Sequence, residues 1–316
     1  MRDTVAGACL CSLMLTLASP SASHTADARP SVLTTRGDVA SLRVVRARQY
    51  RMAGGVRPLL FWINRDDIGL ARITWRAGDA GAFGYEFLVG TDPIKAPRGL
   101  NRWGYIAEDT RGAEASLLAL MTGADEASYD EAASNAEQPA GVTDFRAIRS
   151  SLIDGTSTWQ SARVGSPTRL TVHDVEATLD NVRRDVDAAR RRDLQVPAGM
   201  RGGFLTAAAT LIDAAVRGMK ANESQASIAA RRVQYMFGQG AYELSFRAVE
   251  SGRETVDGKS VPVVRTSFEI RTLATGVRTR FDVTSGRDGD LCGVPIDIAW
   301  QPRWWLRVSL RLEGSS

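Results

Sequence analysis

Alternation of apolar and polar residues over the last third of the chain is the feature that most constrains its fold. Several short alternating runs lie between residues 242 and 312, separated by Gly, Asp and Pro. Successive side chains of a strand point to opposite faces, so this period of two predicts antiparallel strands with one apolar and one polar face. The Gly, Asp and Pro positions between the runs suit turns. We therefore expect an antiparallel β-meander over residues 233–316.

Residues 29–112 have a similar but less regular pattern. Short apolar runs in residues 29–112 are separated by turn-like segments such as 64–67 and 90–93. Breakers at this spacing favour antiparallel strands. We expect an N-terminal β-region over residues 29–112.

The central residues 113–232 predict a helical segment. A short helix is expected at 113–121, followed by an acidic, Ala- and Ser-rich flexible loop at 122–141 that holds few large apolar residues. Apolar residues at spacings of four and three between Val175 and Val186 predict an amphipathic helix. A second helix with a broad apolar face is expected at 204–219.

Together these patterns predict an α+β fold. We expect a mostly antiparallel, curved β-sheet, barrel-like or sandwich-like, that is built from the N- and C-terminal regions. The central helical segment would be inserted between them.

The N-terminus has the layout of a secretory signal peptide. An apolar run from residue 5 to residue 18 is followed by small residues, and such a run is too short to span a bilayer. We expect a signal peptide over residues 1–28, cleaved between 22 and 28, and a periplasmic or extracellular protein without a transmembrane span. Cys292 would then be the one remaining cysteine, buried and without a disulfide.

The composition excludes several kinds of chemistry. In the mature chain His173 is the only secure histidine, so His173 and Cys292 cannot assemble a zinc site, and no phosphate-binding or nucleophile motif is present. The sequence thus predicts no metal and no cofactor. Lys and Arg number 40 against 36 Asp and Glu, a net charge of +4, which is too small to predict a nucleic-acid partner.

Carboxylate chemistry remains open. Asp66, Asp67, Glu86 and Glu108 lie near the ends of expected strands. A glycan hydrolase or lyase needs such a pair across a cleft. A structural explanation is also open, because Asp opens turns by hydrogen-bonding its own backbone, and the nearby aromatic residues either stack on sugar rings or fill the core. These aromatic residues are Trp62, Trp75, Trp103 and Tyr105.

The apolar face of the C-terminal meander offers a second kind of site. A curved sheet with an apolar face, covered by helices, is typical of carriers of apolar ligands. The sequence therefore favours an exported, non-enzymatic envelope protein that binds an apolar or lipid-like ligand, or an envelope lipid, or that serves as a scaffold. The alternative is a carboxylate-dependent glycan hydrolase or lyase in the cell envelope. The candidate ligand-binding residues are Phe246, Phe268, Phe281, Trp300, Trp304 and Trp305.

Overall fold

The computed structural model describes residues 42–56, 62–122, 143–166, 168–197, 199–303 and 306–314. The expected signal peptide at 1–28 lies outside these residues. So does the expected acidic loop, except for Thr122 at its start.

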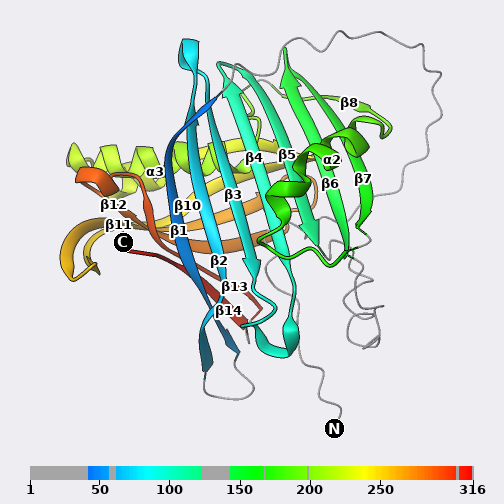
Figure 1. Ribbon diagram of the computed structural model, residues 1–316. Helices are drawn as coiled ribbons and strands as arrows, with labels where there is room; N and C mark the ends of the chain where they lie inside the picture. The colour runs from blue at the N-terminus through cyan, green and yellow to red at the C-terminus, as the bar shows by residue number, and fades with distance from the viewer. Residues whose placement is uncertain are drawn as a thin grey trace.

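The described residues form one large, mostly antiparallel sheet with few helices (Figure 1). The sheet has 14 strands in the part of the chain that the structure describes. Its strands are β1 (Arg43–Val56), β2 (Ile63–Ala77), β3 (Phe83–Thr91), β4 (Trp103–Arg111), β5 (Glu114–Thr122), β6 (Thr143–Ile153), β7 (Thr156–Ser166), β8 (Arg192–Gln195), β9 (Arg232–Phe237), β10 (Gly240–Val256), β11 (Lys259–Thr272), β12 (Arg278–Gly286), β13 (Pro295–Arg303) and β14 (Leu306–Leu312).

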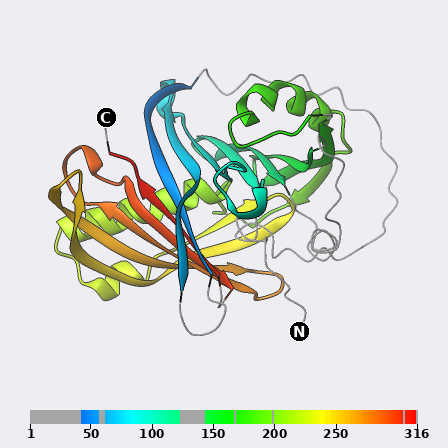
Figure 2. The same cartoon turned by 60° about the horizontal axis from the view of Figure 1, so that its bottom comes forward.

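The order of the strands follows the chain except at one junction. From β1 to β8 and from β9 to β14, each strand pairs with its neighbours in sequence. At the junction β1 pairs with β14, from Tyr50 opposite Leu312 to Val56 opposite Leu306. The strands β8 and β9 are the two ends of the order, so the sheet is curved but not closed (Figure 2). The antiparallel meander predicted for the C-terminal region is confirmed in β9 to β14.

A short crossing segment lies against the β9 end of the sheet. Arg201 forms a parallel bridge with Tyr235. Its N–H donates to the carbonyl of Gln234, and its carbonyl accepts from the N–H of Met236. The chain therefore leaves β8 at one end of the sheet and soon pairs with β9 at the other.

The α-helices of the described residues lie between β7 and β8 or between β8 and β9. They are α2 (Val175–Asp187), α3 (Phe204–Lys220) and the short α4 (Gln225–Ala229), and the described chain also has three 3-10 turns, η1 (Asp79–Gly81), η2 (Pro97–Gly99) and η3 (Gly289–Leu291). Both long helices agree with their predicted positions. None of the helices in the described residues is long and apolar enough to cross a membrane.

The helix predicted at 113–121 is wrong, because these residues form most of β5. The side chains of Leu117 and Met121 are buried on the inner face, which is the face toward the space that the curved sheet encloses. Those of Leu118 and Leu120 are buried on the opposite, outer face. A strand buried on both faces shows no alternation, and its continuous apolar run resembles a helix segment. Residues 113–232 are thus not helical throughout, since they also contain β5 to β8.

Two hydrophobic clusters explain why β3 to β6 are covered on both faces. The outer cluster joins α2 to one face of these strands, with Val175, Val182 and Val186 buried against Trp103 and Tyr105. The inner cluster fills the space that the curved sheet encloses and contains α3. The helix α3 contacts β3 and β4 of the N-terminal half and β9, β10 and β11 of the C-terminal half, so it lies between the two halves (Figures 1 and 2).

Candidate ligand-binding cavity

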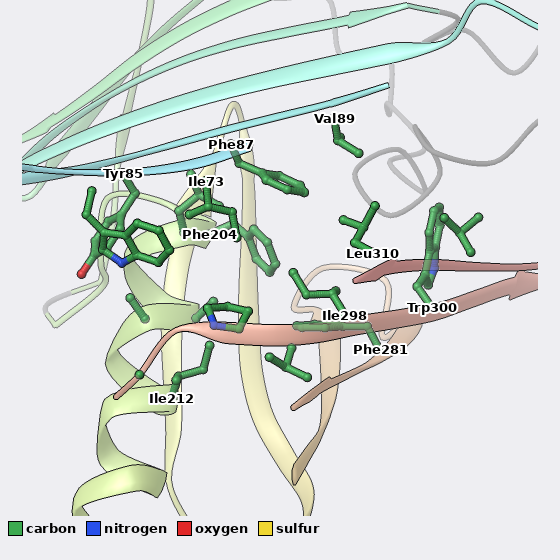
Figure 3. A pocket seen from close by; sticks show the side chains of 18 residues that line it. Ile73, Tyr85, Phe87, Val89, Phe204, Ile212, Phe281, Ile298, Trp300 and Leu310 are labelled. Atoms are coloured by element: carbon green, nitrogen blue, oxygen red, sulfur yellow. The ribbon is translucent and has the colours of Figure 1, made fainter. Parts of the chain in front are cut away.

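A cavity of about 140 Å³ lies in the inner cluster, between α3 and the two halves of the sheet. Figure 3 shows its walls. The lining residues are Ile73 and Trp75 of β2; Tyr85, Phe87 and Val89 of β3; Phe204, Leu205, Ala208, Ala209 and Ile212 of α3; Phe281 and Val283 of β12; Gly293, just before β13; Pro295, Ile298 and Trp300 of β13; and Val308 and Leu310 of β14.

The alternation of the strands and the helical period of α3 build this wall. Ile73 and Trp75 are two residues apart on β2, as are Ile298 and Trp300 on β13, so each pair points to the same face. Along α3 the lining residues recur about one helical turn apart. Two of them, Ala208 and Ala209, are small, and they leave room that larger side chains would fill.

The lining is almost entirely apolar. None of the described lining residues is an Asp, Glu, Lys, Arg or His. The side-chain polar groups of the lining are the hydroxyl of Tyr85 and the indole N–H groups of Trp75 and Trp300. Burial raises the pKa of the Tyr85 hydroxyl to about 12, so it stays neutral. An apolar cavity of about 150 Å³ in another protein binds benzene. The cavity described here is similar in volume and lining but partly open to solvent, and it suits a small hydrocarbon group.

Glu108 lies on the inner face of the sheet and caps the N-terminus of α3. Its side chain is buried, and its carboxylate oxygens accept hydrogen bonds from the N–H groups of Leu205 and Thr206, both at 2.8 Å. These N–H groups belong to the first turn of α3, where the helix dipole favours a negative charge. Burial nevertheless raises the pKa of Glu108 to about 7, against the lowering effect of these hydrogen bonds. Glu108 therefore fixes the start of the helix that lines the cavity.

Glu86 lies on the other face of the sheet. In the register of β3 and β4 it is opposite Ala107, while its neighbour Tyr85 is opposite Glu108. Its carboxylate is 3.2 Å from Nη1 of Arg76, whose Nη2 is 2.6 Å from Oδ1 of Asp109. This arrangement is a partly buried ion-pair network on the outer face.

Asp66 and Asp67 are exposed near the start of β2. Asp67 has a φ of 54°, next to a register shift between β1 and β2, and its carboxylate is 3.0 Å from Nζ of Lys95. On β2 it lies seven residues before Thr74, the residue opposite Glu86. The structure thus leaves the four candidate carboxylates in three separate places, with Asp66 and Asp67 adjacent, and it brings no two of them together across a cleft.

The aromatic residues near these carboxylates also separate. Trp103 and Tyr105 are buried in the outer cluster under α2, and the Trp103 indole N–H donates to the carbonyl of Leu170 at 3.1 Å. Trp75 lines the cavity, and the guanidinium of Arg46 lies 5.7 Å from the centre of its ring. Trp62 is half-buried at the start of β2.

Of the candidate ligand-binding residues, Phe281 and Trp300 line the cavity. Phe268 stacks on Phe281 with ring centres 4.9 Å apart, and Phe246 packs on Phe268 at 5.0 Å, so both lie in the inner cluster beside the cavity wall. Trp304 and Trp305 lie outside the described residues. Sequence reasoning missed the contribution of β3 and α3, although alternation from Phe83 to Val89 marks one face of β3.

The remaining reactive side chains are His173 and Cys292. His173 is exposed, with Nε2 3.8 Å from a carboxylate oxygen of Asp92. Cys292 is half-buried rather than buried and is a free cysteine in the described chain, 3.3 Å from Nζ of Lys220. No group of three or more His, Cys, Asp or Glu that could hold a metal ion occurs within the described ranges.

Comparisons with known proteins show a distant likeness in structure. No family model matches the chain, and no curated protein matches it. A solved structure from Brucella abortus, described as a β-barrel-like protein of the domain of unknown function DUF1849, is similar with a TM-score of 0.41 and 10% identity. The alignment covers 87% of this chain and 98% of that chain.

Proposed function

We propose that the protein binds a small apolar or lipid-like ligand in the cavity between α3 and the sheet, and that it does not transform this ligand. The observation that supports this proposal is a cavity of about 140 Å³ whose lining carries no charged side chain. Apolar cavities with few polar groups are typical of ligand sites in curved sheets.

The placement of the carboxylates favours binding over glycan cleavage. Hydrolysis of a glycosidic bond needs an acid and a base or nucleophile on opposite sides of the bond. Glu108 instead accepts hydrogen bonds from α3, and Glu86 pairs with Arg76 on the outer face. These two carboxylates are thereby committed to structural partners.

We place this binding in the cell envelope. The proposal rests on the signal-peptide pattern of residues 1–28. Native mass spectrometry of protein purified from the envelope of its own cell tests both parts. The expected mass lacks 22 to 28 N-terminal residues and includes a bound apolar molecule that is lost on unfolding; an intact N-terminus contradicts export.

A cavity-filling variant tests the binding site itself. Ala208→Leu adds apolar volume to the lining of the cavity, so it should weaken binding of a small hydrocarbon by about tenfold or more. The probe is isopropenylbenzene, titrated in ligand-detected NMR.

The matched control is Ala214→Leu, the same change on the same helix at a residue that does not line the cavity. It should leave the dissociation constant within about twofold of the unchanged protein, well under the tenfold that 1.4 kcal/mol represents. If the unchanged protein does not bind isopropenylbenzene, or if both variants bind it equally well, the proposed site is wrong.

A further inference from the structure

The cavity has one buried end and one end closer to solvent. Trp300 and Leu310 are buried, whereas Tyr85 and Trp75 are half-buried. Figure 3 shows Tyr85 at the opposite end of the cavity from Trp300 and Leu310. In the register of β2 and β3, Trp75 lies opposite Tyr85, so these two residues mark the same end. We call this end the mouth of the cavity.

Two arginines of β1 lie beside the mouth, on the inner face of the sheet. In the register of β1 and β2, Arg46 is opposite Trp75 and Arg48 is opposite Ile73. Directly opposite residues of an antiparallel pair share a face of the sheet, and both Trp75 and Ile73 line the cavity. The guanidinium of Arg46 lies 5.7 Å from the centre of the Trp75 ring. Both arginines therefore border the cavity, although neither belongs to its lining.

The environment of Tyr50 supports this placement. Tyr50 follows Arg48 by two residues on β1, and its hydroxyl donates to the carbonyl of Pro295 at 2.9 Å. Pro295 lines the cavity. Burial raises the pKa of Tyr50, and the positive charges of Arg48 and Arg46 act against this rise. Both guanidinium groups therefore lie near a hydroxyl that contacts the cavity wall.

These two arginines lack an acidic partner. In the part of the chain that the structure describes, no Asp or Glu forms an ion pair with Arg46 or Arg48. On the outer face of the same strands, Arg51 pairs with Glu313 at 3.3 Å. Two like charges next to each other on one face repel, so an anion placed near both would be favourable.

The α3 side of the mouth carries a carboxylate. The Oδ1 atom of Asp213 would be 3.2 Å from a Cβ on Gly293, which lines the cavity. Burial raises the pKa of Asp213, and the charge of Arg217, one helical turn further along α3, lowers it. The local balance is thus two guanidinium groups on β1 against one carboxylate that has a cationic neighbour of its own.

We propose that the ligand is an anionic amphiphile whose hydrocarbon part fills the cavity and whose carboxylate or phosphate group is bound at the mouth by Arg46 and Arg48. This inference rests on the proposed function and adds the chemical class of the head group. Guanidinium groups bind the oxygens of both anions through paired N–H donors. The head lies at the mouth because no cationic side chain lines the cavity, and an unpaired buried charge is costly.

Two probes of nearly the same shape test the inference. Hydrocinnamate and hydrocinnamamide share a phenyl ring and a two-carbon linker, and they differ in that the first carries a negative charge. The double variant Arg46→Gln with Arg48→Gln should weaken hydrocinnamate binding about tenfold, as expected for loss of hydrogen bonds to a charged group. It should change hydrocinnamamide binding by less than about twofold. Phenethyl phosphate, titrated in the same way, shows which of the two anions is preferred.

The matched control is the double variant Arg51→Gln with Arg311→Gln. These two arginines are opposite each other on β1 and β14, exposed on the outer face, and their removal changes the net charge by the same amount. The control should leave hydrocinnamate binding within about twofold of the unchanged protein. A second measurement needs no variant. The unchanged protein should bind hydrocinnamate more tightly than hydrocinnamamide, and this preference should shrink as salt is added.

The outcomes separate the two proposals. If isopropenylbenzene binds but the unchanged protein binds neither anionic probe more tightly than hydrocinnamamide, the inference is overturned and the cavity remains a binding site. Equal losses of hydrocinnamate binding in the two double variants overturn it as well, because they show an effect of net charge alone. If none of the probes binds the unchanged protein, the proposed function fails and the inference fails with it.

Discussion

Glu108 illustrates how one residue can have the features of a catalytic acid and still serve structure. It is buried, its pKa is raised to about 7, and it lies on the inner face of the sheet. Its oxygens, however, are occupied by the N–H groups of Leu205 and Thr206. A perturbed pKa indicates a functional site only when the group is also accessible to a substrate.

The raised pKa of Glu108 makes stability depend on pH. The ordinary value is 4.5 and the folded value is about 7, so between these values the folded protein holds a proton that the unfolded chain has lost. The free energy of unfolding therefore falls as pH rises through this window and levels off above it. The contribution amounts to roughly 3 kcal/mol over the window.

Glu108→Gln removes this titration. Urea denaturation at several pH values should show that the free energy of unfolding of the unchanged protein, minus that of the variant, falls by roughly 3 kcal/mol between pH 4.5 and pH 7. Glu114→Gln, at an exposed position of β5, is the control and should follow the unchanged protein. Parallel curves for the unchanged protein and Glu108→Gln would contradict a raised pKa.

Single residues of the site could be predicted only in part. Phe281 and Trp300 were found because alternation assigns them to the apolar face of the meander. The same pattern includes Phe246 and Phe268, which fill the core beside the cavity wall. Periodicity predicts which face of a strand a side chain lies on. It does not predict whether that side chain borders a cavity, because the cavity depends on the size of residues from another element, such as Ala208 of α3.

At the scale of elements, α3 is held against β4 and β5 by close approach of its first residues. The segment before the helix contains Gly202 and Gly203, and a Cβ on Gly203 would overlap the Glu108 carboxylate. A Cβ on Gly202 would overlap the side chain of Ala115. Glycine is required here for lack of space, since the φ of Gly203 is −176° and any residue can adopt it.

Gly203→Ala should therefore loosen the start of α3. Because Glu108 would have to move away from the N–H groups of the helix, we expect a loss of about 1–3 kcal/mol in the free energy of unfolding at pH 7. The control is Gly104→Ala on β4, where the nearest atom to the added Cβ, the carbonyl oxygen of Leu120, is 3.8 Å away. Equal losses for the two variants in urea denaturation would show that crowding at Glu108 is not the cause.

The predictions for elements succeeded where one face is wet and failed where both are covered. The stripe on α2 and the strands of the C-terminal region were predicted because their polar faces keep the pattern visible. The outer face of β5 packs in the cluster that contains α2, and its inner face packs in the cluster that contains α3. Leu117 and Leu118 are therefore both buried. The covering elements are distant in sequence, and a local pattern cannot reveal them.

At the scale of the whole molecule, the two ends of the described chain meet in the middle of the sheet. Tyr50 of β1 is opposite Leu312 of β14, and its hydroxyl donates to the carbonyl of Pro295 at 2.9 Å. The sequence contains no local signal for a pairing across such a separation. This junction joins the N- and C-terminal β-regions into one sheet, as expected, but the choice of β1 and β14 as the paired strands could not be predicted.

We expect the two halves to unfold together. The inner cluster includes Tyr50 and Met52 from β1 and Val308 and Leu310 from β14, so neither half keeps its core without the other. Thermal unfolding followed by far-UV circular dichroism and by tryptophan fluorescence should give coincident transitions. Two separate transitions, or a protease-resistant fragment that contains only β1 to β7, would contradict this expectation.

The open ends of the sheet have a consequence for how the protein behaves at high concentration. An exposed strand with free N–H and C=O groups is a template on which further chains can add and grow into aggregates. Here β8 is only four residues long and carries the charged residues Arg192 and Asp193. The crossing segment at Arg201 pairs with part of the edge of β9 that faces away from β10. Both edge strands of this open sheet are thereby protected against pairing with another copy of the chain into a fibre.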